Sequence, residues 1–436
     1  MRTASSAAGA AGELAPWSLN ESLIRSTPEV SAQSLAANLE AVCGIGPRWH
    51  GTPAEEQTIE LMSERLRAVC DQVELEEFPY THYTPQATSL QISRPLAQPL
   101  HCVAVQYSGT GRVAGQLVYA GQGHQEDFQA LRETGASLRD RIVLMRTNRP
   151  YLAGGYARAD GACGIVVISD SPFGTVRQMT SQMGYEPGED LSAFGLPIPG
   201  VIVSREDGER LLSLLSAGPV EGRIEHRSAV QVRRSHNVIG YQWGKDRQER
   251  SILIGAHYDT QFGLDGAWDN GSGCAALLEI ARVCAGSAAR RTRIFCAFGG
   301  EEIGLFGSTA FVRRRAEELK RVLAYFNLDS TSGDVPYTHD LLITRRLEGF
   351  ARELVASYSD WLITSCREFT VLDHEQDSAE FVRQGVEAFW AHEEGNAFFH
   401  TVYDSLDTVD PAKLARATRV ALLPFHYLAH AEIVPI

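Results

Sequence analysis

Several features that mark common classes of protein are missing from this 436-residue chain. No apolar run approaches the length of about 18 residues that spans a bilayer. The N-terminal residues contain no run of Leu, Val or Ile like the core of a signal peptide, so we expect a protein that is made and kept in the cytoplasm. Basic residues are outnumbered, 40 Lys and Arg against 54 Asp and Glu, which gives a net charge of −14. A protein that binds phosphate backbones presents a basic surface, so we expect neither a nucleic-acid nor a membrane partner.

Several catalytic motifs are missing as well. The sequence contains no HExxH, no GxSxG and no phosphate-binding glycine loop. The eight cysteines form no CxxC pair, and most lie in apolar stretches, which favours buried, reduced thiols. The rest of the composition is typical of a globular protein, with 44% hydrophobic and 22% charged residues.

The length of the chain exceeds the usual size of one hydrophobic core, which predicts two domains or one domain with an insert. We expect residues 1–30 to be a disordered lead-in. Residues 99–227 contain short β-rich apolar runs separated by Gly and Pro, typical of a small accessory domain of α/β or β-barrel-like type. This accessory domain would be inserted into a main domain made of residues 31–98 and 228–436.

Strands and helices alternate in the last part of the chain. Before it, the spacing of apolar residues predicts helices over 31–42 and 54–69 and a strand over 72–78. From Ser235 onward, strand-like runs lie at 236–240, 251–255, 292–298, 322–328 and 386–390, and helical patterns at 273–284, 306–315 and 346–357. This alternation predicts an α/β fold with a mostly parallel, doubly wound sheet and helices on both faces. Ligands of such folds bind beyond the carboxyl ends of the strands.

Polar residues that a buried strand would not otherwise carry follow four of these strands. They are His257 and Asp259, then Glu301 and Glu302, then Asp329, and finally His400, while Asp269 stands just before a predicted helix start. Because the carboxyl ends of parallel strands share one edge of a sheet, we expect these side chains to lie together.

Two histidines, two aspartates and one glutamate suit a pair of divalent metal ions. We assign His257, Asp269 and Asp329 to one ion, and Asp269, Glu302 and His400 to the other. The shared carboxylate of Asp269 would offset the repulsion between two cations about 3.5–4 Å apart.

Two further acids have expected roles at this site. Asp259, two residues beyond His257, would accept the second N–H of the imidazole and fix its tautomer. Glu301 is next to a ligand but points elsewhere, which leaves it free to act as general base.

Each residue also has a simpler interpretation when it is taken alone. A His-x-Asp pair is typical of a capped strand end, and two glutamates suit the N-terminus of a solvated helix. Asp269 would serve as a helix cap, Asp329 as a turn residue and His400 as a surface histidine. Their joint occurrence, in order and each at a strand end, favours the metal site.

Five motifs in this order resemble the M28 family of zinc peptidases. They read Gly255-Ala-His-Tyr-Asp, Asp269-Asn-Gly-Ser-Gly, Gly300-Glu-Glu-Ile-Gly-Leu-Phe-Gly-Ser, Asn327-Leu-Asp and His400-Thr-Val-Tyr-Asp. The loop that starts at Gly46 and the strand that starts at Ser235 are also similar to family segments. Residues 99–227 resemble the protease-associated domain that some members carry as an insert.

The resemblance implies the same ligands and the same base. It further implies two zinc ions per chain, with Co²⁺ or Mn²⁺ as alternative divalent ions, and a cis peptide bond between Asp269 and Asn270. The sequence departs from the family at Gln376, where members often have Ser before the Asp of a weaker motif. Some members hold the oxyanion with a Tyr near there, and His374 is the candidate for that role here, with a plain surface histidine as the alternative.

The resemblance favours an aminopeptidase that acts on a peptide or aminoacyl amide, because the stretch between His257 and Asp269 is short as in aminopeptidase members. A carboxypeptidase, or an amidohydrolase of small metabolites, on the same site stays open. So does a binding role like that of the transferrin-receptor-like relatives, whose metal site is degraded. Trp268 and Phe399 suggest an apolar substrate pocket, although such aromatics also fit an ordinary core.

Overall fold

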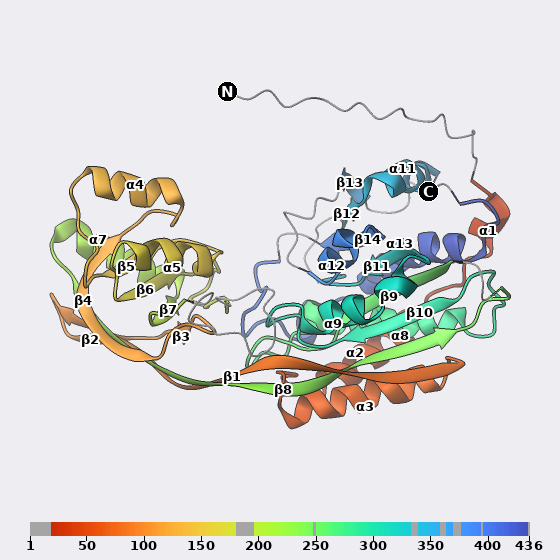
Figure 1. The fold of residues 1–436 in the computed structure, drawn as a ribbon, viewed down its shortest axis with the longest axis horizontal. Helices are drawn as coiled ribbons and strands as arrows, with labels where there is room; N and C mark the ends of the chain where they lie inside the picture. Colours follow the sequence, from red (N-terminus) through yellow and green to blue (C-terminus); the bar gives the residue numbers. More distant parts are fainter. Residues whose placement is uncertain are drawn as a thin grey trace.

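The protein has two lobes joined by a pair of long antiparallel strands, as the computed structural model shows (Figure 1). Strand β1 (Gln72–Arg94) pairs with strand β8 (Glu221–Gln242) from one lobe to the other. The structure describes residues 19–179, 196–246, 250–332, 339–357, 363–368, 376–393 and 396–434.

The first lobe is built on a mixed sheet with the order β13-β12-β14-β11-β9-β10-β8, and β1 continues it beyond β8. Its strands are β9 (Ser251–His257), β10 (Arg293–Phe298), β11 (Val322–Asn327), β12 (His339–Ile343), β13 (Ile363–Glu368) and β14 (Glu387–Glu393). The four central strands, β14, β11, β9 and β10, are all parallel to one another. The expected α/β fold with a mostly parallel sheet is therefore confirmed.

Helices cover both faces of this sheet, because alternate residues of a strand point to opposite sides. On β9, Ile252 and Ile254 belong to the large apolar cluster under helices α2, α3, α8, α11 and α13, whereas Leu253 belongs to the cluster under α9 and α12. The helices are α1 (Glu21–Arg25), α2 (Ala32–Cys43), α3 (Pro53–Arg67), α8 (Ser272–Cys284), α9 (Phe306–Arg314), α10 (Ala316–Leu319), α11 (Arg345–Ser357), α12 (Ser378–Arg383) and α13 (Pro411–His430).

The helix starts follow from local capping chemistry. The Thr52 hydroxyl accepts a hydrogen bond from the backbone N–H of Glu55, and Pro53 occupies the first turn of α3. Helix α13 starts in the same way, with the carboxylate of Asp410 as cap and Pro411 in the first turn.

The second lobe is a smaller α/β unit between the far ends of β1 and β8. Its elements are β2 (Gln98–Leu100), β3 (Val103–Ala104), β4 (Gly111–Tyr119), α4 (Gln125–Glu133), β5 (Ile142–Met145), α5 (Pro150–Ala159), β6 (Gly164–Ile168), β7 (Gly200–Val203) and α7 (Arg205–Ala217). Strands β4 to β7 are parallel neighbours. On β5, Val143 and Met145 face one apolar cluster and Ile142 and Leu144 another, so this sheet also has a core on each face.

Two expectations from the sequence need correction, and one helix was missed. The strand expected over 72–78 continues to Arg94, because its partner β8 is equally long. The lead-in expected over 1–30 contains helix α1, whose Ile24 is buried against the first lobe, while residues 1–18 lie outside the described part. The 20-residue helix α13 was not anticipated at all.

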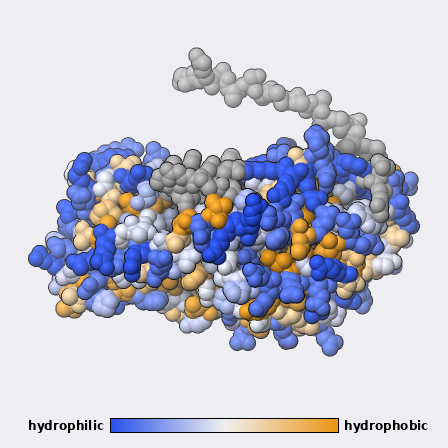
Figure 2. Space-filling view, turned by 60° about the horizontal axis from the view of Figure 1, so that its bottom comes forward, coloured by the Kyte–Doolittle hydropathy of each residue, from blue (hydrophilic) through white to orange (hydrophobic). Residues whose placement is uncertain are grey.

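The described surface is mixed in character. Hydrophilic residues cover most of the face drawn in Figure 2, and apolar residues form small groups between them, as on most folded proteins. Among the described residues no helix combines the length and the apolar character that a membrane span requires.

We predict that Phe326→Ala lowers the free energy of unfolding by about 3–5 kcal/mol, the usual cost of a large cavity in a core. Phe326 is fully buried on β11, with ring centroids 5.0 Å from Phe389 and 5.6 Å from Phe425. Denaturant unfolding of the whole chain provides the measurement. Phe173→Ala is the matched control, because the Phe173 side chain is 72% exposed and its loss leaves no cavity.

Candidate metal centre

The polar residues that follow the four central strands meet at one edge of the sheet. His257 is the last residue of β9, Glu301 and Glu302 follow β10, and Asp329 follows β11. These side chains are all buried, although each is ionisable. Parallel neighbours bring their carboxyl ends together, which is why residues far apart in sequence become neighbours here.

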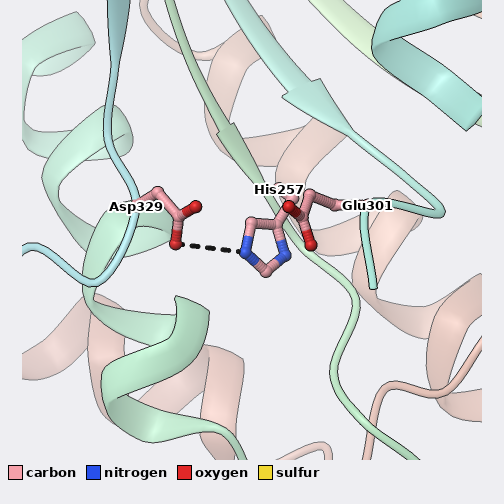
Figure 3. Close-up of side chains that lie close together, drawn as sticks. All are labelled: His257, Glu301 and Asp329. Atoms are coloured by element: carbon pink, nitrogen blue, oxygen red, sulfur yellow. Dashed lines mark hydrogen bonds and ion pairs between the residues drawn. The ribbon is translucent and has the colours of Figure 1, made fainter. Parts of the chain in front are cut away.

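Two groups of side chains lie within reach of a common centre. In the first, the ligand atoms of His257, Glu301 and Asp329 lie within 4.8 Å of one another, and His257 Nε2 is 3.3 Å from Asp329 Oδ1 (Figure 3). In the second, the atoms of Asp269, Glu302 and His400 are equally close. His400 Nε2 lies 3.1 Å from Glu302 Oε2.

Asp269 lies between the two groups. Its Oδ1 is 3.1 Å from His257 Nε2, and its Oδ2 is 3.0 Å from His400 Nε2. One carboxylate therefore presents one oxygen to each group. The five side chains that the sequence suggested as ligands converge in this arrangement. Glu301 was expected to point elsewhere, but its carboxylate lies in the first group with His257 and Asp329.

The backbone around Asp269 is held by the carboxylate of Asp404. Asp404 accepts hydrogen bonds from the backbone N–H of Trp268 (2.7 Å) and of Asp269 (3.1 Å). The peptide bond between Asp269 and Asn270 is cis, as the resemblance implied. Asp404 ends the His400 motif, so the sequence contained this residue without indicating what it contacts.

Asn270 connects the Asp269 segment to the loop that carries Asp329. Its side-chain N–H donates to the carbonyl of Leu328 (2.7 Å), and its Oδ1 accepts from the backbone N–H of Gly273 (2.9 Å) and of Ser330 (3.3 Å). These bonds satisfy both ends of the side-chain amide and fix the spacing of the two loops.

Arg48 holds the loop that connects His257 to Asp269. Its guanidinium group donates to the backbone carbonyls of Tyr258, Asp265 and Gly266, within the loop between His257 and Asp269. The loop that starts at Gly46 was matched to the family from sequence, but nothing in the pattern indicated this contact.

The side chain of Asp259 differs from its expected position. Asp259 Oδ1 is 3.6 Å from His257 Nδ1, whereas the backbone oxygen of Asp259 lies at 3.2 Å and accepts the imidazole N–H. The carboxylate instead accepts the backbone N–H groups of Glu301 and Glu302, each at 3.2 Å. Asp259 thus fixes the His257 tautomer through its main chain and the Glu301–Glu302 turn through its side chain.

Buried negative charge dominates the electrostatics of the site. Burial raises the pKa of Glu301 well above its ordinary value and the pKa of Asp377 to about 7. Burial opposes protonation of His400, but the carboxylates of Glu302 and Asp269 outweigh it and raise the pKa of that imidazole to about 10. The protein alone therefore places more carboxylates here than its own cations neutralise, which is the environment that a divalent cation stabilises.

The donor set fits divalent metal ions. Imidazole nitrogens and carboxylate oxygens are the usual ligands of zinc. Glu302 Oε1 is buried and has no hydrogen-bond partner among the described residues, so it is an acceptor still to be satisfied.

The three candidate substrate contacts have different outcomes. His374 lies outside the described residues. Trp268 is only 3% exposed and packs in an apolar cluster with Leu35 and Leu39, which places it in the core instead of a substrate pocket. Phe399 packs partly buried against the same cluster, with its ring centroid 5.7 Å from that of Trp268 and Arg177 over its face.

Comparisons with known proteins find a matching family model and similar proteins. Residues 237–423 match the family model of peptidase family M28. Aminopeptidase YwaD of Bacillus subtilis (strain 168) is 28% identical over 387 residues, which cover 86% of this chain and 79% of the relative. A probable glutamate carboxypeptidase, VP8 of Zea mays, is 25% identical over 407 residues, covering 77% of this chain and 56% of that protein. The alignment thus spans little more than half of the maize relative's length.

Solved structures share the fold. A peptidase M28 precursor from Shewanella amazonensis SB2B superposes with a TM-score of 0.77 at 22% identity, covering 95% of this chain and 96% of that one. An aminopeptidase from Aneurinibacillus sp. strain AM-1 gives a TM-score of 0.72 at 22% identity, covering 94% and 97%. Both similarities therefore extend over the two lobes.

The family match covers the part of the chain that carries all five candidate ligands, and the fold is shared over both lobes. Within residues 237–423, the chain is therefore similar to peptidase family M28.

We predict that Asp404→Ala lowers the free energy of unfolding, because it leaves two buried backbone N–H groups without an acceptor. Each such group costs about 1–3 kcal/mol. Denaturant unfolding of the whole chain measures the loss. The exposed Asp407 of the same segment gives the matched control, and Asp407→Ala should change stability by no more than about 0.5 kcal/mol. Equal effects of the two substitutions would contradict the role of Asp404.

Proposed function

We propose that this protein is an aminopeptidase that uses two zinc ions, one held by His257, Asp269 and Asp329 and the other by Asp269, Glu302 and His400. The observation that carries the proposal is the position of Asp269. Its Oδ1 lies 3.1 Å from Nε2 of His257, and its Oδ2 lies 3.0 Å from Nε2 of His400. An aspartate bridge between two cations needs this arrangement.

The chemistry of the cleavage step follows from this assignment. When bound, the two metal ions would lower the pKa of a water molecule and polarise the carbonyl group of the scissile bond. Glu301 would accept the proton of the attacking water and transfer it to the leaving amine. Its buried position and its raised pKa suit a group that accepts a proton during the reaction.

Asp259 would position the general base Glu301 and the ligands Glu302 and His257. Its carboxylate holds the backbone N–H groups of Glu301 and Glu302, so the base and its neighbouring ligand share one anchor. Its backbone oxygen accepts the Nδ1–H of His257, which leaves Nε2 of that imidazole for a metal ion.

The charge of the site supports cleavage at the amino end of a peptide. A protonated α-amine is attracted to the buried carboxylates, whereas a substrate carboxylate needs a free cation. Arg48 is committed to three backbone carbonyls, and Arg177 pairs with Asp170 at 3.2 Å and covers the ring of Phe399. The guanidinium group of Arg48 is therefore fully engaged, whereas Arg177 keeps a buried Nε–H without a partner among the described residues.

The relatives also favour cleavage at the amino end of a peptide. The similarity to Aminopeptidase YwaD covers most of both proteins, whereas the similarity to the maize glutamate carboxypeptidase covers 56% of that protein. Peptides and aminoacyl amides are therefore the proposed substrates. We further infer that the second lobe corresponds to the protease-associated-like insert expected over residues 99–227.

We predict hydrolysis of aminoacyl-p-nitroanilides that have a free amine, and no hydrolysis when the amine is acylated. The reason is the attraction between the buried carboxylates and a protonated amine. Chelation of metal should abolish the activity, and added Zn²⁺ should restore it. Release of p-nitroaniline is the measurement. Cleavage of N-blocked peptides from their carboxyl end would instead identify a carboxypeptidase, and a purified protein that binds no zinc would support a binding role.

Glu301→Gln should lower kcat by about 10²–10⁴-fold, the usual contribution of a general base. The amide keeps the shape of the side chain but does not accept a proton, so zinc content should stay at the level of the unmodified protein. Steady-state kinetics and metal analysis of the same preparation provide the two measurements. The exposed Glu56 supplies a matched control, and Glu56→Gln should leave kcat unchanged. Full turnover by Glu301→Gln would remove Glu301 from the mechanism.

A further inference from the structure

Two segments of the second lobe reach the candidate metal centre. Gln106 follows strand β3 and Gln178 lies beyond strand β6. The two are joined by a bond from Gln106 Nε2 to Gln178 Oε1 (3.0 Å), and the backbone N–H of Gln106 donates to the carbonyl of Met179 (3.0 Å). Their neighbours Val105 and Met179 are both buried in the same apolar core of the second lobe. The pair is therefore fixed to the body of that lobe.

Gln178 holds His400 through its main chain. The backbone N–H of Gln178 donates to the carbonyl of His400 (2.9 Å), and the carbonyl of Gln178 lies 3.2 Å from His400 Nδ1. This carbonyl accepts the Nδ1–H, so Nε2 of His400 is left facing Asp269 and Glu302. The side-chain amide of Gln178 also donates to the carbonyl of Phe262 (2.7 Å), which ties the segment to the first lobe a second time.

Gln106 reaches Glu302 through one intermediate residue. Gln106 Nε2 donates to Gln261 Oε1 at 2.5 Å, and Gln261 Nε2 donates to Glu302 Oε2 at 2.7 Å. Gln106 and Gln261 are each only 2% exposed, so water does not compete for these bonds. Two buried amides thus connect the core of the second lobe to one carboxylate of the site.

These contacts reach only one of the two groups of candidate ligands in the described part of the chain. His257 and Asp329 are held by residues of the first lobe, through the backbone oxygen of Asp259 and the loop contacts of Asn270. His400, by contrast, is contacted directly by Gln178 of the second lobe, and Glu302 is reached from Gln106 of that lobe through Gln261. The two metal positions therefore differ in what keeps their ligands in place.

We propose that Gln106, Gln178 and Gln261 are positioning residues through which the second lobe sets the zinc affinity of the position formed by Asp269, Glu302 and His400. The proposal rests on the function given above, in which that position holds one of two zinc ions. Partners behind the ligands fix the imidazole tautomer and orient the carboxylate, and their loss typically lowers metal affinity by about 10–100-fold. The position formed by His257, Asp269 and Asp329 keeps its affinity.

The test uses the whole chain with Gln106→Leu, and separately with Gln261→Leu, since each removes the amides and approximately keeps the volume. Zinc is titrated into metal-free protein against a competing chelator, and both binding constants are fitted. We expect one constant to weaken by about 10–100-fold and the other to stay within the error of the unmodified protein. Because the two glutamines act in series, the double variant should lose less affinity than the product of the two single losses.

Gln129→Leu provides the matched control, because Gln129 belongs to the second lobe and its amide bonds only the exposed Glu133. Its two zinc constants and the thermal midpoint of its metal-free form should equal those of the unmodified protein. Equal weakening of both zinc constants, or two unchanged constants, in Gln106→Leu and Gln261→Leu would overturn the positioning role. If the unmodified protein binds fewer than two zinc ions, the proposed function itself fails, and the titration identifies that result before any variant is compared.

Discussion

The placement of Asp269 between two histidines is the constraint on which the rest of the site depends. A buried carboxylate with an imidazole at 3.1 Å on one oxygen and another at 3.0 Å on the second tolerates little displacement. The surrounding residues act accordingly: Asp404 holds the backbone before the cis peptide bond, and Asn270 spaces the Asp269 segment from the Asp329 loop. Burying several carboxylates away from water is costly unless cations lie beside them. For this reason Glu302 and Asp269 raise the pKa of the His400 imidazole, whose protonated form supplies a positive charge.

The second lobe also contacts this site. Long strands such as β1 and β8 join the lobes through a continuous ladder of backbone hydrogen bonds, so the two parts of the sheet are covalently and structurally continuous. The contacts of Gln106 with Gln261 and of Gln178 with His400 connect the two lobes a second time, at the candidate metal centre. His400 and Glu302 of the first lobe are thus contacted by residues of the second lobe, directly by Gln178 and through Gln261 by Gln106.

Much of the fold could be predicted because its signals are local. The period-two pattern of β9 places Ile252 and Leu253 on opposite faces, and capping residues such as Thr52 set helix starts within a few positions. Strand β1 was predicted too short, since its last part is stabilised by pairing with β8, a partner more than a hundred residues away. The position of Trp268 was also beyond prediction, because an aromatic residue beside a ligand suits a pocket and a core equally until its neighbours are known.

The sequence by itself determined the chemistry of the site. Residue type and place at a strand end are written in the chain, and parallel strands necessarily bring His257, Glu302 and Asp329 to one edge. Only the tertiary structure decided how those groups are supported. The partner of His257 Nδ1 is a backbone oxygen and the partner of Glu302 is Gln261, and contacts of this kind depend on distances between segments that no local pattern encodes. A glutamine has the same appearance in a sequence whether its amide faces water or orients a ligand, because its hydrogen bonds are assigned only when the chain has folded around it.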